Sequence, residues 1–135
     1  MLYLKGFIKR GELSSFVIFK GDTPVGFALF TDSFVVDDTF IPLKKEAKLL
    51  KLVAIDPVAQ GKGLAKHLVF SVLKLFPKTK RIKLSTEISK DIVIGKPKNQ
   101  KACQMYLRYG FKPYIENKIN YDPSKKQFFV WDNPH

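Results

Sequence analysis

The chain contains 135 residues, of which 45% are hydrophobic and 13% aromatic, and its formal net charge is +12. This composition excludes a disordered chain, because its apolar side chains suffice to build a core. One cysteine and two histidines exclude an internal disulfide framework and a multi-cysteine zinc site. The length predicts one domain over residues 1–135, without a secretory signal or an apolar membrane span. We therefore expect a cytoplasmic protein with no metal cofactor and no membrane partner.

The positive charge is concentrated in the middle of the chain. Residues 40–112 hold 17 basic and 4 acidic residues, a net charge of +13, whereas the remainder carries −1. Such a segment favours a phosphorylated ligand, a polyanion such as RNA or another acidic partner. A basic surface that only contacts solvent explains the same charge, and the charge alone does not choose between these interpretations.

The first predicted element is an antiparallel hairpin. Residues 15–20 and 25–30 are rich in β-branched and aromatic side chains, and the turn-forming residues 21–24 separate them. Residues 34–36 and 39–41 either extend this hairpin or form an excursion from it.

A strand, a turn and a helix follow. Residues 49–55 form an apolar run that Asp56 and Pro57 end, which predicts a central strand buried on both faces. Residues 61–76 predict an amphipathic helix that Pro77 stops. Its apolar face comprises Leu64, Leu68, Val72 and Leu75, widened by Ala65, Val69 and Phe76.

The last third of the chain predicts one helix and three strands. The helix covers residues 99–109, with Asn99 as N-cap and Gly110 as the C′ residue, and a loop over residues 88–98 precedes it. The strands cover residues 81–87, 111–115 and 127–131. The element order predicts an α/β fold of the α+β layered kind, in which helices flank a mixed sheet.

Residues 60–65, Gln-Gly-Lys-Gly-Leu-Ala, connect the central strand to the first helix. A helix N-terminus offers unpaired N–H groups, and glycines allow a ligand to approach the backbone closely. Lys62 and Lys66 add full positive charges. The spacing fits neither a Walker A loop nor a Rossmann loop. The segment therefore predicts either a phosphate or pyrophosphate site of another kind or a turn without a ligand.

Residues 56–65 resemble the acetyl-coenzyme A motif of the GNAT superfamily of N-acetyltransferases, Q/R-x-x-G-x-G/A. Gln60, Gly63 and Ala65 fill its defined positions. A second family motif, N-x-x-A-x-x-x-Y-x-x-x-G-F, is similar to the pattern formed by Asn99, Ala102, Tyr106, Gly110 and Phe111. The resemblance covers roughly residues 15–131. It implies a GNAT-like, mostly antiparallel sheet flanked by helices, with acetyl-coenzyme A as acetyl donor.

The resemblance also implies roles for individual residues. Backbone amides of residues 61–65 would hold the pyrophosphate, and the edge of the central strand would pair with the pantetheine arm. Tyr106 would donate a proton to the leaving thiolate, as its phenol is protonated at neutral pH. The implied cofactor contacts are Val53, Ile55, Gln60, Gly61, Lys62, Gly63, Leu64, Ala65, Asn99 and Tyr106.

Other interpretations of these residues remain open. Tyr106 could be a core aromatic residue, Asn99 a plain N-cap and Cys103 a buried small hydrophobe. Many relatives place a carboxylate on the strand before the pyrophosphate loop, but this strand has Lys48 and Lys51 instead. Glu87 is then the best candidate for the general base. A surface carboxylate at Glu87, with a water chain removing the proton, is the alternative.

The chain departs from the family at its N-terminus. Most members have a strand and two helices before the hairpin, where this chain has about 14 residues. In most members the two helices form one wall of the acceptor pocket. The chain is therefore a minimal member with an open acceptor site, a fragment of a longer protein, or a subunit whose partner, such as a second copy in a homodimer, completes that wall.

The leading functional hypothesis is an N-acetyltransferase that acetylates a primary amine of an unidentified acceptor. One alternative is a basic nucleic-acid-binding module, in which Tyr109 and Tyr114 stack on bases. An acetyltransferase that acts on an RNA-linked amine, such as aminoacyl-tRNA, combines the two. The remaining alternative is a GNAT-like protein that binds coenzyme A without catalysis.

Overall fold

The computed structural model describes residues 2–10, 13–36, 39–44, 46–61, 63–87 and 100–134. The strands are β1 (Leu2–Arg10), β2 (Leu13–Lys20), β3 (Thr23–Thr31), β4 (Ser33–Val36), β5 (Thr39–Pro42), β6 (Ala47–Ile55), β7 (Arg81–Glu87), β8 (Lys112–Tyr114) and β9 (Lys126–Asp132). The helices are α1 (Leu64–Val69), α2 (Val72–Leu75) and α3 (Gln100–Arg108), and a short 3-10 helix covers Pro57–Ala59.

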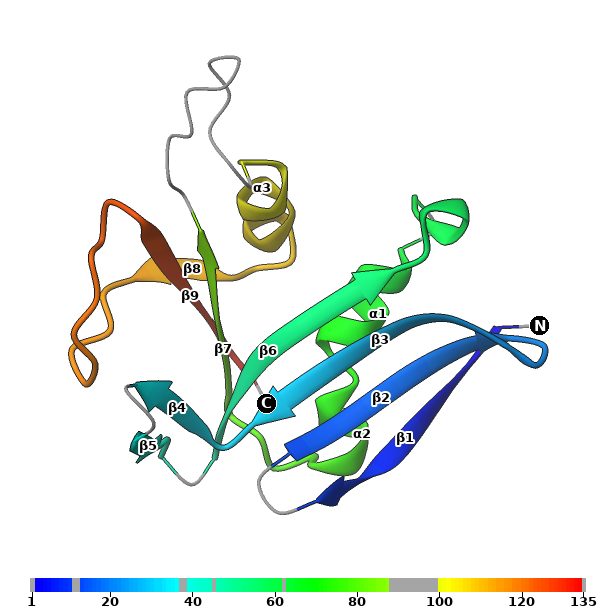
Figure 1. Ribbon diagram of the computed structural model, residues 1–135, viewed down its shortest axis with the longest axis horizontal. Coiled ribbons are helices and arrows are strands. Elements are labelled where there is room, and N and C mark those ends of the chain that lie inside the picture. Colours follow the sequence, from blue (N-terminus) through cyan, green and yellow to red (C-terminus); the bar gives the residue numbers. More distant parts are fainter. Residues whose placement is uncertain are drawn as a thin grey trace.

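Seven strands form one sheet in the order β1-β2-β3-β6-β7-β9-β8. Its neighbouring strands are antiparallel except β6 and β7, which are parallel. Helices α1, α2 and α3 share one hydrophobic core with the sheet and cover one of its faces (Figure 1). The predicted fold, a mixed and mostly antiparallel sheet flanked by helices, is confirmed.

Strand β1 corrects the prediction for the N-terminus. It pairs antiparallel with β2, from Leu2↔Lys20 to Arg10↔Leu13. Its sequence gives only a weak strand signal, because lysines and a glycine interrupt the apolar residues without regular alternation. The predicted element order, which begins at the hairpin, therefore lacks this strand. Only residues 11 and 12 connect β1 to β2, which leaves no room there for the two helices of most family members.

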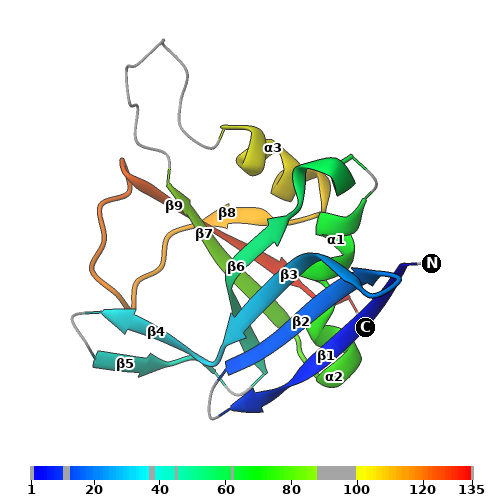
Figure 2. The same cartoon turned by 45° about the vertical axis from the view of Figure 1, so that its right-hand side comes forward.

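Strands β2 and β3 confirm the predicted hairpin, and the next two strands form a separate unit. Strands β4 and β5 pair only with each other, so they are an excursion rather than an extension of the hairpin (Figure 2). The buried Phe34 of β4 packs edge-to-face on Phe128 at 5.8 Å between ring centroids. Phe129, the residue after Phe128 in β9, belongs to the core beneath the helices. Adjacent residues of a strand point to opposite faces, so β4 covers the face without helices.

Strand β6 is buried on both faces only in its first half. It pairs with β7 from Ala47 to Leu50 and with β3 along most of its length. The β3 register shifts between Leu29↔Leu52 and Phe30↔Leu50, which leaves Lys51 as an extra residue. Such a bulge bends a strand and increases its twist. Leu52 is 52% exposed beyond it, so the prediction of a fully buried strand over 49–55 is wrong past the bulge.

The predicted helix over residues 61–76 is divided into α1 and α2. The hydroxyl of Ser71 donates a hydrogen bond to the carbonyl of Leu68 at 2.6 Å, and the Ser71 N–H bonds the same carbonyl at 3.1 Å. These local bonds compete with the regular helical ladder. The apolar face shifts at this break, so Leu75 is 47% exposed although the helical pattern places it inside.

Helix α3 ends as predicted, with Gly110 in the C′ position. Gly110 has φ +95°, and its N–H donates to the Leu107 carbonyl at 3.1 Å. The N–H of Phe111 donates to the Tyr106 carbonyl at 3.0 Å, which completes a Schellman motif. The predicted N-cap Asn99 and the predicted loop over 88–98 lie outside the described residues.

No helix of the described residues is both long and apolar enough for a membrane span.

The break between α1 and α2 gives a stability prediction. Leu68→Ala should lower the free energy of unfolding by about 2–5 kcal/mol, because it leaves a cavity under α1. Leu75→Ala should cost less than about 1 kcal/mol, since an exposed leucine leaves little cavity. Urea unfolding measures both. Equal losses for the two variants would show that one continuous helix buries both side chains.

Candidate functional site

The two parallel strands at the centre of the sheet separate halfway along their length. The last pair in their register is Leu50↔Leu84. Beyond this pair β6 and β7 diverge (Figure 1), and residues 51–55 have no strand partner on that side among the residues that the structure describes. We call the point where the strands part the apex. The bulge at Lys51 lies directly beyond it, so the bulge accounts for the divergence. The result is an unpaired strand edge in the middle of a sheet.

Backbone polar groups of β6 face this opening. The N–H of Asp56 donates to the Val25 carbonyl of β3 at 2.8 Å. Because successive residues of an antiparallel strand turn their backbone groups to opposite sides, Val53 and Ile55 direct theirs to the unpaired edge. The Ile55 carbonyl accepts a hydrogen bond from Gln60 Nε2 at 3.2 Å. The groups left for a ligand are the N–H and C=O of Val53 and the N–H of Ile55.

A glycine-containing turn follows the unpaired edge. Asp56 Oδ1 accepts a hydrogen bond from the Val58 N–H at 3.1 Å, which fixes the 3-10 helix before the turn. Gly61 and Gly63 have φ values of +82° and +75°, and a Cβ on either would meet no atom within 4 Å. Both glycines therefore border open space in a conformation that other residues adopt rarely.

The turn leads directly into α1. Gly63 is the N-cap, and the N–H groups of the first turn, Leu64 to Lys66, precede the first helical bond, from His67 to the Gly63 carbonyl. The Leu64 side chain is buried in the core and anchors the turn. The structure thus brings Gln60, Gly61, Gly63, Leu64 and Ala65 together beside the predicted pantetheine edge. Lys62 lies outside the described residues.

Tyr106 lies at the apex on the helix-covered face. Its ring centroid is 6.2 Å from that of Phe129, and Phe129 stands opposite Leu84, the last residue of β7 that pairs with β6. The side chain is 6% exposed and packs edge-to-face on Tyr109 and Phe111. Burial, with smaller contributions from Tyr109 and Cys103, raises the pKa of Tyr106 to about 12. The phenol is therefore protonated throughout the physiological range.

The other predicted residues differ in what the structure shows of them. Cys103 is half-buried, and its Sγ shares a hydrogen bond with Thr86 Oγ1 at 3.2 Å, which ties α3 to β7. This contact gives Cys103 a structural role. The side chain of Glu87 and the whole of Asn99 lie outside the described residues, so their roles stay predictions. No cluster of His, Cys, Asp or Glu suited to a metal occurs in the described part of the chain.

The structure adds a buried ion pair that no sequence pattern indicates. Lys83 Nζ lies 3.0 Å from Glu116 Oε2, and the Tyr114 hydroxyl donates to the same oxygen at 2.8 Å. Burial alone would raise the pKa of Glu116. Hydrogen bonds from Tyr114, Lys83 and the Lys118 N–H outweigh burial and lower that pKa. Burial and the bond to Glu116 raise the pKa of Tyr114. Glu116 is thus held as a carboxylate.

Ion pairs account for part of the clustered positive charge. Four basic residues of the middle segment have carboxylate partners: Lys48–Asp32 at 2.5 Å, Lys80–Glu46 at 3.2 Å, Arg81–Asp132 at 2.7 Å and Lys83–Glu116 at 3.0 Å. The aromatic rings considered for base stacking are engaged as well. Lys66 Nζ lies 5.9 Å from the Tyr109 ring centroid, and Tyr114 binds Glu116. These contacts weaken the argument that the charge requires a polyanionic partner.

The sequence matches the Acetyltransferase (GNAT) family over residues 2–111. The chain belongs to the GNAT family of acetyltransferases. No curated protein matches it at a significant level.

Solved structures of acetyltransferases share the fold. An acetyltransferase from Thermus thermophilus has a TM-score of 0.66 at 18% identity, covering 90% of this chain and 65% of its own. The PaiA N-acetyltransferase of Thermoplasma acidophilum, in complex with coenzyme A, has a TM-score of 0.63 at 15% identity over 90% and 62% of the two chains. A Bacillus subtilis acetyltransferase, also in complex with coenzyme A, has a TM-score of 0.65 at 10% identity over 98% and 99%. This chain thus spans less than two thirds of the Thermus and Thermoplasma proteins.

The open space at Gly63 gives a binding prediction. Gly63→Ala should weaken coenzyme A binding at least ~10-fold, which corresponds to about 1.4 kcal/mol, because the methyl group and backbone strain obstruct close approach to the turn. Isothermal titration calorimetry measures the affinity.

Gly21→Ala is the matched control. Gly21 has φ +61° and equally open surroundings, but it lies in the β2–β3 turn. Both variants should lose about 1–2 kcal/mol of folding stability from the left-handed conformation. If Gly21→Ala weakened binding as much as Gly63→Ala, the turn at Gly63 would not be the ligand site.

Proposed function

We propose that this GNAT protein is an N-acetyltransferase that transfers the acetyl group of acetyl-coenzyme A to a primary amine. The observation that carries the proposal is the unpaired edge of β6, which runs from the apex beside Tyr106 to the glycine turn before α1. An acyl donor with a phosphate group at one end and a thioester at the other fits such an arrangement. The coenzyme A complexes of the Thermoplasma and Bacillus proteins support this choice of donor.

The residues of the site fit coenzyme A. Val53 and Ile55 offer amide partners for the amide groups of a pantetheine arm. The open cradle at Gly61 and Gly63, with the first N–H groups of α1, suits a pyrophosphate. Lys66 is exposed on the first turn of α1 and adds a positive charge there. Gln60 acts indirectly in this account, because its side chain holds the turn against the Ile55 carbonyl.

The donor supplies an activated thioester, and the chain's own groups position and stabilise the reaction. The neutral amine attacks the carbonyl carbon, the new C–N bond forms, and the C–S bond breaks to leave a thiolate. In this proposal the hydroxyl of Tyr106, whose ring packs at the apex, reaches that thiolate and stabilises it. The pKa of a thiol is about 8.5, whereas that of Tyr106 is raised to about 12. The phenol therefore keeps its proton and acts chiefly as a hydrogen-bond donor to the thiolate.

The amine must lose a proton during the reaction, and Glu87 remains the proposed acceptor of that proton. Glu116 is a poorer base, because its pKa is lowered and both of its oxygens accept hydrogen bonds. A water chain from the opening to solvent is the alternative route.

Incubation with acetyl-coenzyme A and a set of amines tests the proposal directly. Amine-dependent release of free thiol is expected, and its absence together with absence of coenzyme A binding would overturn the proposal.

Tyr106→Phe should lower kcat about 100-fold, since it removes one hydrogen-bond donor to the developing thiolate. Affinity for coenzyme A should change less than about twofold. In the parent protein, kcat/KM should rise with pH as the amine loses its proton and should show no alkaline fall up to about pH 10, because the pKa of Tyr106 is raised to about 12. Steady-state thiol release across pH measures both effects.

Tyr109→Phe provides the control, because it removes a hydroxyl from a neighbouring tyrosine. The ring centroids of Tyr106 and Tyr109 are 6.4 Å apart, and the Tyr109 ring lies beside Lys66. It should retain kcat within about twofold. A Tyr106→Phe variant with full kcat would leave Tyr106 as a core aromatic residue.

A further inference from the structure

A cluster of buried and half-buried polar and aromatic side chains covers the helix-free face of the sheet near the apex. We call it the Lys83–Glu116 cluster; its members are Phe34, Lys83, Tyr114, Glu116, Tyr121 and Phe128. The side chains of Lys83 and Glu116 are 14% and 5% exposed. The Tyr121 hydroxyl accepts a hydrogen bond from the Glu116 N–H at 3.1 Å, and Glu116 Oε1 accepts one from the Lys118 N–H at 3.3 Å. This bonding holds the segment after β8 against β7.

The same cluster holds the β4–β5 hairpin in place. Lys83 Nζ lies 5.9 Å from the Phe34 ring centroid and 5.2 Å from that of Tyr114. The rings of Phe34 and Tyr121 pack on Phe128 at 5.8 and 4.8 Å between centroids. The hairpin, the segment after β8 and strand β7 therefore form one packed unit.

This unit ends at the apex. Lys83 pairs with Leu49, one position before the last β6–β7 pair. Ser85, two residues beyond Lys83 on the same face, is exposed. The cluster therefore borders the opening from the face that carries no helix among the described residues.

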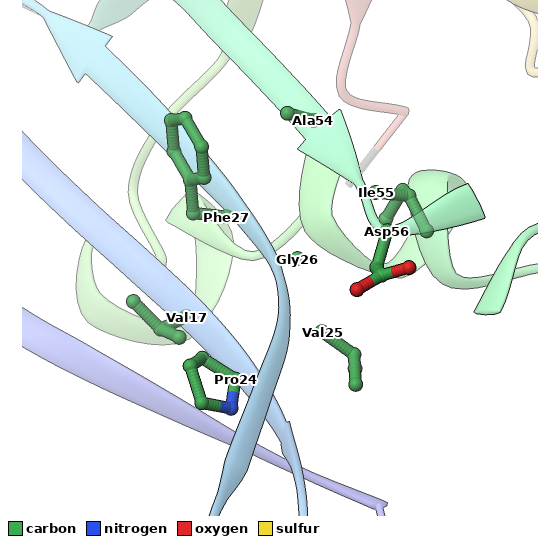
Figure 3. A pocket seen from close by; sticks show the side chains of 8 residues that line it. All are labelled: Val17, Pro24, Val25, Gly26, Phe27, Ala54, Ile55 and Asp56. Atoms are coloured by element: carbon green, nitrogen blue, oxygen red, sulfur yellow. The ribbon is translucent and has the colours of Figure 1, made fainter. Parts of the chain in front are cut away.

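The other border of the opening is an apolar strip. Val17, Phe27 and Ala54 lie side by side across β2, β3 and β6, and Leu29 and Leu52 form the next row toward the apex. Phe27 is 43% exposed and Leu52 is 52% exposed. A depression of about 470 Å³ adjoins the strip, lined by Val17, Pro24, Val25, Gly26, Phe27, Ala54, Ile55 and Asp56 (Figure 3).

We propose that the acceptor binds on the helix-free face, between the Lys83–Glu116 cluster and the apolar strip, and that it is a monoamine with an apolar substituent. The proposal rests on the proposed acetyl transfer, which puts the reacting carbon at the apex between these borders. Phe27 and Leu52 contact the apolar substituent. Lys83 and Glu116 are positioning residues, because their ion pair holds the Lys83–Glu116 cluster in place and the cluster forms one wall of the acceptor site.

Charge selects this class of amine over a polyamine. Among the described residues of the Lys83–Glu116 cluster, Glu116 is the carboxylate, and its pairing with Lys83 makes it unavailable to a second ammonium group. Lys51 is exposed at the bulge and repels additional positive charge. The exposed side chains of Phe27 and Leu52 gain free energy by covering an apolar group. The strip is continuous with the opening, so an amine at the apex places its substituent on the strip.

The first part of the test compares two amines in the thiol-release assay. Phenethylamine should show a KM at least about tenfold lower than spermidine, as its ring covers the apolar strip. A lower KM for spermidine, or no transfer to phenethylamine by a protein that binds coenzyme A, would overturn the proposed acceptor class.

The second part uses two variants. Leu52→Asn should raise the phenethylamine KM about fivefold, and Glu116→Gln should raise it similarly by loosening the wall. The KM for acetyl-coenzyme A should stay within about twofold in both. Glu46→Gln and Leu75→Asn are matched controls: Glu46 belongs to an exposed ion pair with Lys80, and Leu75 is 47% exposed on α2. Neither control should change either KM.

The outcomes separate this proposal from the proposed function. Loss of coenzyme A binding in the parent protein contradicts the function itself. Normal acetyl transfer with an unchanged phenethylamine KM in Leu52→Asn contradicts only the acceptor site, even if Glu116→Gln fails to fold. A dimer that Leu52→Asn dissociates without changing this KM would assign the strip to a second copy of the chain and overturn the proposal.

Discussion

The organisation of this protein depends on one interruption of its sheet. The extra residue Lys51 bends β6, and pairing with β7 ends at Leu50↔Leu84. Breaking a sheet in its centre leaves backbone N–H and C=O groups without partners, which is costly unless water or a ligand satisfies them. In the proposed function these backbone N–H and C=O groups of β6 form the binding site, because they can pair with the amides of an extended ligand arm.

The two faces of the sheet stabilise the opening in different ways. On the helix-covered face, the rings of Phe70, Tyr106, Tyr109, Phe111 and Trp131 join α1, α3 and the C-terminal strands. On the other face, the Lys83–Glu116 ion pair and four further aromatic rings hold the β4–β5 hairpin against β7. A buried ion pair contributes little net stability after desolvation, but removing one partner leaves an unpaired buried charge and destabilises the fold. The pair therefore fixes the position of the segment after β8 against β7. The strands that border the opening are thereby held apart on both sides.

Local sequence patterns predicted the elements whose signals are local. The hairpin at 15–30, the glycine turn at 60–65 and the C′ position of Gly110 each depend on a few neighbouring residues. Features that depend on distant contacts were not predictable in this way. The bulge at Lys51 appears only in the register with β3, and Glu116 meets Lys83 from 33 positions away. The resemblance of two motifs supplied the predicted cofactor contacts, and the structure showed why Val53 and Ile55 face the opening.

The most direct test of the account is amide hydrogen exchange of β6 with and without coenzyme A. We expect the exchange of the Val53 and Ile55 amides to slow when coenzyme A binds, because both face the unpaired edge. The amides of Leu52 and Ala54 already face β3 and should change little. Coenzyme A binding that leaves the exchange of Val53 and Ile55 unaltered would contradict the claim that the interrupted sheet is the binding site.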